Sequence, residues 1–401
     1  MNLGEKILQM FKDLPLTDKE KKLFINRKKE INKMENIGRF MQSSIYGIAG
    51  RAGSGKTTLF NLIKFSDKNI IKIIISISEK ETKNVIIADL LYKLCEKILQ
   101  NKKLSKSHKY AKETLEFLRN EEVKGKDKGV KVGKIIEGES KWSLQTKKRF
   151  NLSSIKNRLE KIVKLITSKN KIVFCIDEID KERKKDVIVI LDSIKNVLIS
   201  KNLLSFIALP QLMYKQYLED RTRFFSEENL ENILKDIISV GNLSDEDIES
   251  MLDKRTQEFP RILPKKVKKL VIDYADGNPR EALLVCQNTL LNKKIAENYK
   301  KKDFILTIDE VVNEIEKFIE KWIDYLELTP REKQFLQIIY DEPNSSKLEL
   351  IKLALKKSKI PRTTLNSIIK SLIKKKIFME SSKDIYKIDK KVKLHFKYIE
   401  R

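Results

Sequence analysis

Eight consecutive residues, Gly50 to Thr57, have the types and spacing needed to hold a chain of phosphates. They fit the pattern G-x-x-x-x-G-K-[ST], between a predicted strand and a predicted helix, which is the context that the pattern requires. Glycines let backbone N–H groups converge on phosphate oxygens, Lys56 can reach the β- and γ-phosphates, and Thr57 can bind Mg²⁺. The residues expected to bind the nucleotide are Gly50, Arg51, Ala52, Gly53, Ser54, Gly55, Lys56, Thr57 and Thr58.

A second candidate for phosphate chemistry lies more than a hundred residues further along the chain. The apolar run 172–176 ends in two carboxylates, Asp177 and Glu178. At the end of a strand beside the phosphate loop, Asp177 would hold Mg²⁺ and Glu178 would orient or deprotonate an attacking water. The alternative is a strand that simply runs into a charged turn, since Asp180 and Lys181 follow. The upstream phosphate loop favours the catalytic interpretation, which implies ATP and Mg²⁺ as cofactors and ATP hydrolysis as the activity.

The segments between these motifs alternate between the two secondary structures. Apolar runs with little polar alternation predict buried parallel strands, and segments with helical spacing separate them, so we expect an α/β fold of βαβ units. Residues 101–150 break the pattern and are expected to form an inserted hairpin or mobile loop. From Ser244 onward the signal is helical, and Ser244 with Asp247 resembles a capping box. The strands are expected at 44–49, 70–77, 171–176, 204–209 and 233–240.

Charge and composition limit the classes of protein. The chain has 401 residues and a formal net charge of +27, a field that attracts polyanions, although part of it reflects a composition rich in Lys, Asn and Ile. No apolar run approaches a membrane span and no secretory leader is recognisable, so we expect a cytoplasmic protein that makes no membrane contact. Three widely separated cysteines and two histidines exclude a disulfide framework and a multi-histidine metal site.

Several motifs together resemble the AAA+ ATPases, in particular the replication-initiator branch and archaeal STAND-type ATPases. Residues 26–31 resemble the box that precedes the first strand, which implies that Arg27 packs near the adenine. Residues 176–180 match the acidic box. Residues 275–280 resemble the sensor-2 motif, in which Arg280 of a helical lid would touch the γ-phosphate. Lid closure could then report whether ATP or ADP is bound.

The resemblance also implies an arginine finger, and it fails at one position. Arg221 and Arg223 lie where the family places a finger that acts on the nucleotide of a neighbouring subunit, which implies self-association on ATP binding. Ordinary surface arginines are the alternative for both. The family's sensor-1 residue is not recognisable, because Pro210 follows the fourth strand and Gln211 is the nearest polar residue. Hydrolysis is therefore expected to be slow.

The C-terminal segment is basic and looks like a winged helix. Residues 331–401 hold 19 Lys and Arg against 8 Asp and Glu. Residues 363–373 have one apolar face, and two short strands follow that read as a wing. In that fold the third helix enters the major groove of double-stranded DNA and the wing touches phosphates, although winged helices also serve as protein-packing domains. The residues expected to contact DNA are Arg362, Thr364, Asn366, Lys370, Lys374, Lys375 and Lys383.

The resemblance thus implies a P-loop NTPase with a parallel sheet flanked by helices, an all-helical lid and a C-terminal winged-helix domain. We expect a helical segment at 1–42, the ATPase base at 43–242, the lid at 243–326 and the winged helix at 327–401. The first hypothesis is an ATP-driven, initiator-like switch that binds double-stranded DNA, with a role in DNA replication. A STAND-type signalling or defence ATPase, whose winged helix makes protein contacts, and a transposition-helper ATPase remain alternatives.

Overall fold

The computed structural model divides the chain into two compact units, which we describe separately. The sheet unit holds residues 15–21 and 27–241, and the helical unit holds residues 1–14, 22–26 and 242–401. The residues that the structure describes are 3–77, 83–123, 151–179, 184–222, 230–293, 301–342, 345–375, 377–382 and 385–398.

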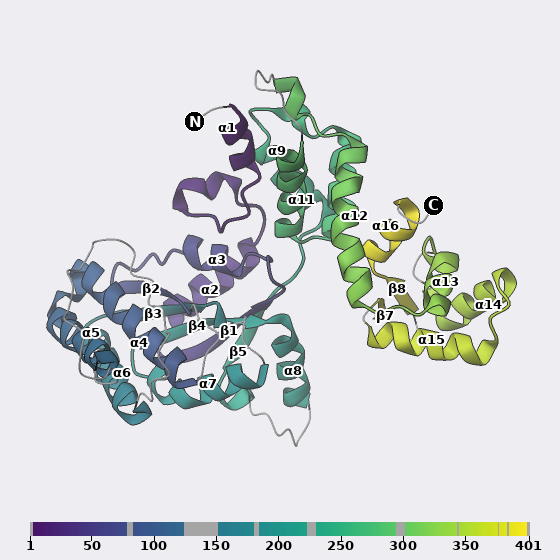
Figure 1. Ribbon diagram of the computed structural model, residues 1–401. Helices are drawn as coiled ribbons and strands as arrows, with labels where there is room; N and C mark the ends of the chain where they lie inside the picture. Colours follow the sequence, from purple (N-terminus) through teal and green to yellow (C-terminus); the bar gives the residue numbers. More distant parts are fainter. Residues whose placement is uncertain are drawn as a thin grey trace. The chain divides into compact units, whose positions relative to one another are not determined.

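The sheet unit is built on five parallel strands in the order β2-β3-β4-β1-β5 (Figure 1). Their residues are mostly buried, because helices cover the sheet and leave β-branched side chains little contact with water. The prediction of an α/β fold with a parallel sheet flanked by helices is confirmed. The strands are β1 (Ser44–Gly50), β2 (Ile70–Ser76), β3 (Lys171–Asp177), β4 (Leu203–Pro210) and β5 (Asp236–Val240).

Helices connect these strands and supply the rest of one hydrophobic core. The buried faces of α4, α6 and α7 carry Ile, Leu and Val at helical spacing and pack with the apolar side chains of the strands. The α-helices of this unit are α2 (Lys28–Phe40), α3 (Lys56–Leu62), α4 (Lys83–Gln100), α5 (His108–Val123), α6 (Leu152–Thr167), α7 (Lys184–Leu198) and α8 (Gln211–Thr222). Short 3₁₀-helices are η1 (Asp18–Leu23), which crosses the unit boundary, η2 (Lys102–Ser107) and η4 (Leu230–Asn232).

The predicted hairpin or loop at 101–150 is wrong for its first part. Residues 102–123 form η2 and α5, and α5 packs against α4. Leu104, Ala111, Leu115 and Leu118 are buried there, so an apolar stripe exists in spite of the many lysines around it. Residues 124–150 lie outside the described residues.

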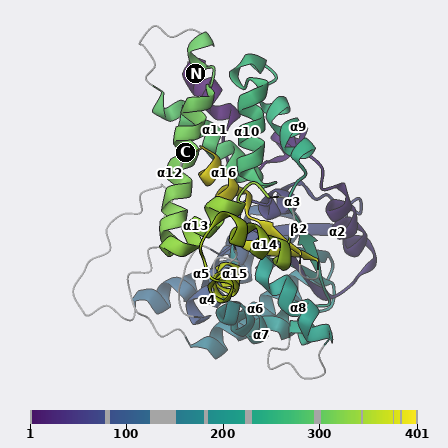
Figure 2. The same cartoon turned by 90° about the vertical axis from the view of Figure 1, so that its right-hand side faces the viewer.

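The helical unit contains most of the remaining helices and a small antiparallel sheet. Helices α10, α11 and α12 lie side by side (Figure 2), and α1 from the N-terminal segment packs on α11. The α-helices are α1 (Leu3–Met10), α9 (Asp245–Arg255), α10 (Lys265–Ala275), α11 (Pro279–Asn292), α12 (Ile308–Tyr325), α13 (Pro330–Ile339), α14 (Lys347–Lys357), α15 (Arg362–Lys374) and α16 (Lys390–Tyr398). Two 3₁₀-helices, η5 (Pro260–Ile262) and η6 (Lys301–Phe304), and the strands β6 (Ser345–Ser346), β7 (Phe378–Ser382) and β8 (Ile385–Ile388), in the sheet order β6-β8-β7, complete the unit. None of the described helices combines the length and hydropathy needed to cross a bilayer.

Side-chain caps fix where several of these helices begin. The predicted capping box at the start of α9 is confirmed, since Asp247 N–H donates to Ser244 Oγ and Ser244 N–H donates to Asp247 Oδ2. The same reciprocal pattern starts α12, α13 and α14. At α11, Asn278 Oδ1 accepts from the Arg280 N–H and Pro279 takes the first helical position, where its missing N–H costs nothing.

The cap of α13 also anchors the end of another helix in the core. Glu332 is 3% exposed, and its Oε2 accepts from Thr329 N–H at 2.8 Å and from Lys375 Nζ at 2.9 Å. Burial alone would raise the pKa of Glu332, but hydrogen bonds from Ser371, Thr329 and Lys375 outweigh it and lower the pKa. The Lys375 side chain, which is 23% exposed, is thereby paired with Glu332, and its predicted contact with a DNA phosphate stays a prediction.

Glu332→Gln should lower the free energy of unfolding of the helical unit by about 1–3 kcal/mol at neutral pH, because a charge-assisted pair is lost. The folded pKa lies below the unfolded one, so the stabilisation is present above the unfolded pKa and disappears as the pH falls through the folded pKa. Urea unfolding should therefore show the variant and the wild type converging below about pH 4. The exposed capping residue Glu349, changed to Gln, is the control and should cost less; a constant gap down to acid pH would contradict this account.

Candidate functional site

The phosphate loop connects the end of β1 to the start of α3, and glycine is required at three of its positions. Gly53 and Gly55 have φ angles of 79° and 96°, in the left-handed region that favours glycine. A Cβ on Gly50 would lie 2.6 Å from Ser54 Oγ and 2.8 Å from the Val240 carbonyl oxygen. The backbone at Gly50 therefore lies too close to Ser54 and Val240 for any residue that has a Cβ.

Lys56 is folded back over this loop. Its side chain is buried, and Nζ donates to the carbonyl oxygens of Gly50 at 2.9 Å and Arg51 at 3.2 Å. An ammonium group at this position is available for phosphate oxygens, which attract it more strongly than neutral carbonyls do. The structure thus places the Lys56 ammonium group at the phosphate loop, and its contact with phosphates stays a prediction.

Arg27 supports the same loop from a position well before it in the sequence. Its guanidinium is buried and donates to the carbonyl oxygens of Ser54 at 3.4 Å and of Gly241 at 2.6 Å, and it pairs with Glu30 at 3.2 Å. Arg27 itself has a φ of 69°, a conformation that costs a non-glycine residue about 1–3 kcal/mol. These contacts make Arg27 a support of the loop backbone; the predicted contact with adenine stays a prediction.

Asp177 and Glu178 stand at the same sheet edge as the phosphate loop. Strand β4 lies between β3 and β1, and the register pairs Ile176 with Ile207 and Gly50 with Pro210. Asp177 is 2% exposed, and its Oδ1 accepts from the Glu178 N–H at 2.9 Å. Because parallel strands end together, both carboxylates project at the edge where the loop begins.

Glu178 is held in a strained conformation. Its φ of 68° lies in the left-handed region, where a residue with a Cβ is disfavoured by about 1–3 kcal/mol. Strain of this kind concentrates at functional sites, since the surrounding structure must enforce it. The side chain is half-buried, which leaves the carboxylate able to meet a ligand and water.

The residues present fit a nucleotide triphosphate with Mg²⁺. Among the residues that the structure describes, the buried Ser54 Oγ has no hydrogen-bond partner and a Cβ on Gly55 would meet no atom within 4 Å, so the loop has both an unsatisfied polar group and open space. Thr57 and Asp177 offer the hydroxyl and carboxylate oxygens that Mg²⁺ prefers, and phosphates and waters complete its shell. No cluster of three acidic, histidine or cysteine side chains within the described ranges forms a site for a metal bound by protein alone.

Two of the predicted finger and sensor residues, Arg221 and Gln211, lie in α8, which follows β4. Arg221 is exposed at the end of α8, and its guanidinium lies 3.5 Å from the Tyr217 hydroxyl and over the ring of that residue. Arg223 is outside the described residues. Gln211, the first residue of α8, follows Pro210 directly and is exposed. Their roles in catalysis stay predictions.

Arg280 belongs to the helical unit, at the start of α11. Its side chain is 45% exposed, and Nε lies 3.5 Å from Asp13 Oδ2. A long, solvent-exposed ion pair of this kind contributes little to stability. The predicted role of Arg280 at the γ-phosphate stays a prediction.

Sequence reasoning missed Lys72, which fixes the far end of the phosphate-loop helix. Its Nζ donates to the carbonyl oxygens of Phe60, Asn61 and Ile63 at 2.8 to 2.9 Å, so a cation meets the negative end of α3. Burial lowers the pKa of Lys72. The available signal was a single lysine inside the apolar run 70–77.

Arg27→Ala should weaken ATP, ADP and inorganic tripolyphosphate binding by a similar factor of about ten, since the loop backbone loses a charged donor. Fluorescence competition titrations measure all three affinities. Arg39→Ala, on the exposed face of the same helix, is the control and should have no effect. An unchanged tripolyphosphate affinity with weakened ATP binding would instead assign Arg27 to the adenine.

A family model and several solved structures match this chain. The model of the KAP family P-loop domain matches residues 26–341. The Walker-type ATPase paby2304 of Pyrococcus abyssi has a similar fold, with a TM-score of 0.54, 16% identity and coverage of 96% of this chain and 99% of that one. The RuvB Holliday junction branch migration motor of Thermotoga maritima gives a TM-score of 0.40 at 14% identity, with 96% of this chain and 99% of that chain covered. A point variant of it gives a TM-score of 0.41 at 14% identity, with 97% of this chain and 99% of that chain covered. No curated protein sequence gives a significant match.

The family match takes in the phosphate loop, Arg27, and the strand that ends in Asp177. The similarity to the archaeal ATPase supports the fold over nearly the whole chain. The chain therefore belongs to the KAP family of P-loop NTPases.

Proposed function

We propose that this protein is an ATPase switch that binds Mg²⁺ and ATP at the phosphate loop and grips double-stranded DNA through its C-terminal helices, in the manner of an initiator. The observation that carries the ATPase proposal is the common sheet edge at which the phosphate loop and the Asp177–Glu178 pair meet. A phosphate-binding backbone, a metal ligand and a candidate base at one edge are the parts that phosphoryl transfer to water requires.

Each side chain then has one role. Lys56 exchanges its carbonyl acceptors for the β- and γ-phosphates and neutralises charge as the γ-phosphoryl group leaves. Thr57 and Asp177 would hold the Mg²⁺, which would supply positive charge to the phosphates. Glu178 accepts a hydrogen bond from the attacking water and aligns it with the γ-phosphorus. ADP and phosphate are the products.

Glu178→Gln should keep ATP binding within about threefold and lower the hydrolysis rate by about 10²–10⁴-fold, because only the water loses its acceptor. Lys56→Ala is the matched contrast and should remove binding itself. Phosphate release and equilibrium binding of a fluorescent ATP analogue separate the two effects. Wild-type hydrolysis by Glu178→Gln would show that another group activates the water.

The DNA-binding proposal is supported by the exposed surface of α15. Leu365, Ile368, Ile369 and Leu372 are buried on one side of the helix, and the basic residues Arg362, Lys370 and Lys374 are exposed. Three helices followed by the antiparallel β7–β8 pair have the order of elements found in a winged helix. A basic helix of this kind suits the major groove.

The other predicted DNA contacts have different surroundings. Thr364 and Asn366 are half-buried, and Asn366 Nδ2 donates to the Arg362 carbonyl oxygen at 3.2 Å. This bond is local and can be exchanged for a base edge, so Asn366 remains part of the proposal. Lys383 lies outside the described residues.

Replacing Lys370 and Lys374 by Ala should weaken duplex DNA binding by at least about tenfold and reduce the slope of log K against log salt by about 2. Fluorescence anisotropy at two salt concentrations, with ATP, ADP or no nucleotide, measures both quantities. Lys109→Ala with Lys112→Ala, which removes two exposed lysines from α5, is the charge-matched control. If both double variants lose the same DNA affinity, the loss reflects the lower net charge of the protein and not a contact made by α15.

A signalling ATPase of the STAND type is the second candidate, and one observation favours it. Helix α16 makes ion pairs with α9, the end of α10 and α11: Lys390 lies 3.3 Å from both Asp245 and Asp276, and Lys391 pairs with Glu281. Burial alone would lower the pKa of Lys390, but Asp276 and Asp245 outweigh it and raise the pKa. A C-terminal region packed in this way suits a resting state that ATP opens for self-association. If the Lys370 and Lys374 variant keeps its DNA affinity but changes its self-assembly, the signalling function is supported.

A further inference from the structure

Strand β2 stands first in the strand order and forms one of the two edges of the sheet. In a β-strand, each residue directs its N–H and C=O groups to the same side of the strand, and successive residues alternate between the two sides. Ile77 N–H donates to the Asp177 carbonyl oxygen at 3.1 Å, so the odd-numbered residues face β3. Lys72, Ile74 and Ser76 therefore direct their N–H and C=O groups outward, away from the sheet.

Two of these three residues have outward N–H and C=O groups that are open to a further strand. The Ser76 carbonyl oxygen accepts from Lys93 Nζ, which closes that end of the edge. Among the described residues, the outward backbone groups of Lys72 and Ile74 form no hydrogen bond. An edge with open donors and acceptors is a template for another strand.

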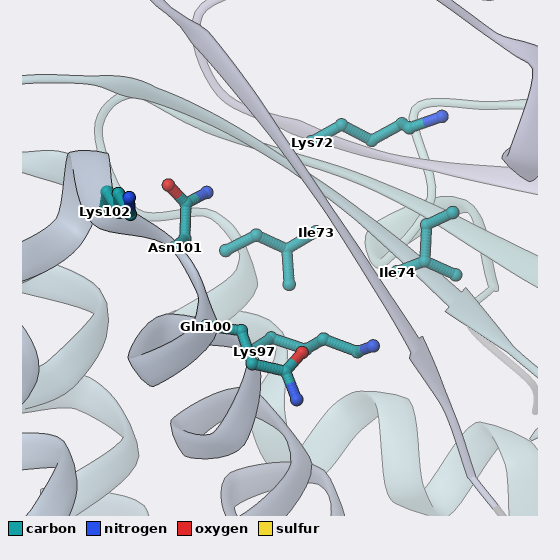
Figure 3. A pocket seen from close by; sticks show the side chains of 7 residues that line it. All are labelled: Lys72, Ile73, Ile74, Lys97, Gln100, Asn101 and Lys102. Carbon is teal, nitrogen blue, oxygen red and sulfur yellow. The ribbon is translucent and has the colours of Figure 1, made fainter.

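A groove of about 390 Å³ lies along this open stretch. It is lined by residues 72–74 of β2, Lys97 and Gln100 of α4, and Asn101 and Lys102. Figure 3 shows Ile73 between the strand and the end of α4, where Gln100 and Asn101 also lie. The Lys72 ammonium group is bound at the end of α3, so Lys72 contributes its backbone groups to the groove and not its charge.

The charge of the groove selects its ligand. Lys97 and Lys102 are exposed, and no acidic side chain is among the lining residues. We propose that this edge binds an extended acidic segment of a partner protein, which adds a strand beside β2. Backbone hydrogen bonds to Lys72 and Ile74 would supply affinity, and carboxylates would meet the two lysines.

Other occupants fit the groove less well. A nucleic acid offers phosphate acceptors for the N–H groups and lysines, but its sugar-phosphate backbone has no N–H donors at strand spacing for the outward carbonyl groups of Lys72 and Ile74. A second copy of this chain, joined edge to edge, would bring lysines 97 and 102 of both copies together. An acidic strand supplies donors, acceptors and opposite charge at once.

The test uses the full chain and a fluorescent peptide of about eight alternating Glu and Val residues, longer than a typical strand. We expect saturable binding that slows amide hydrogen exchange in residues 70–77. Lys97→Glu with Lys102→Glu should weaken binding at least tenfold, and Lys109→Glu with Lys112→Glu, exposed on α5, should not. The same peptide N-methylated at alternate residues, which cannot complete a ladder, should lose binding with the protein unchanged.

Three results would overturn the proposal. They are equal binding of a matched Lys and Val peptide, equal binding of the N-methylated peptide, and a single-stranded oligonucleotide that binds through Lys97 and Lys102 while the acidic peptide does not. These measurements need no nucleotide, so their results do not depend on whether the protein hydrolyses ATP or binds double-stranded DNA.

Discussion

The carboxyl ends of β1 and β3 lie at one edge of the sheet because both strands run parallel to β4, which separates them. This direction is set by the helical crossovers, since two parallel neighbours cannot be joined by a short turn. It brings the phosphate loop and Asp177 together although more than a hundred residues separate them. A reversed β3 would place the two carboxylates at the opposite edge, and no loop geometry could compensate.

The loop itself is prepared for its ligand by cations that hold its carbonyl groups. Lys56 binds the carbonyl oxygens of Gly50 and Arg51, and Arg27 binds that of Ser54. When carbonyl groups are turned toward cations, the peptide N–H groups are turned the other way, toward an anion. The left-handed conformations of Gly53 and Gly55 make this orientation possible. Phosphate binding then needs little reorganisation of the backbone, which preserves binding free energy.

The sequence predicted most of what depends on local patterns. The phosphate loop, the parallel sheet and the Ser244–Asp247 cap follow from spacing within a few residues. The contacts of Arg27 and Lys72 could not be predicted, because they join residues that only the folded sheet brings together. Lysine-rich composition concealed the apolar stripe of α5. The pairing of Lys375 with Glu332 could not be predicted either, because it joins segments that only the folded helical unit brings together.

We expect Lys56, Thr57 and Asp177 together to receive the phosphates and Mg²⁺ of one nucleotide. The most direct measurement is a crystal structure with Mg²⁺ and a non-hydrolysable ATP analogue. The account predicts that Lys56 Nζ leaves the carbonyl oxygens of Gly50 and Arg51 for the β- and γ-phosphates, while the Thr57 hydroxyl and an Asp177 oxygen lie beside the metal ion. A nucleotide bound elsewhere, with Lys56 still on those carbonyl groups, would contradict it.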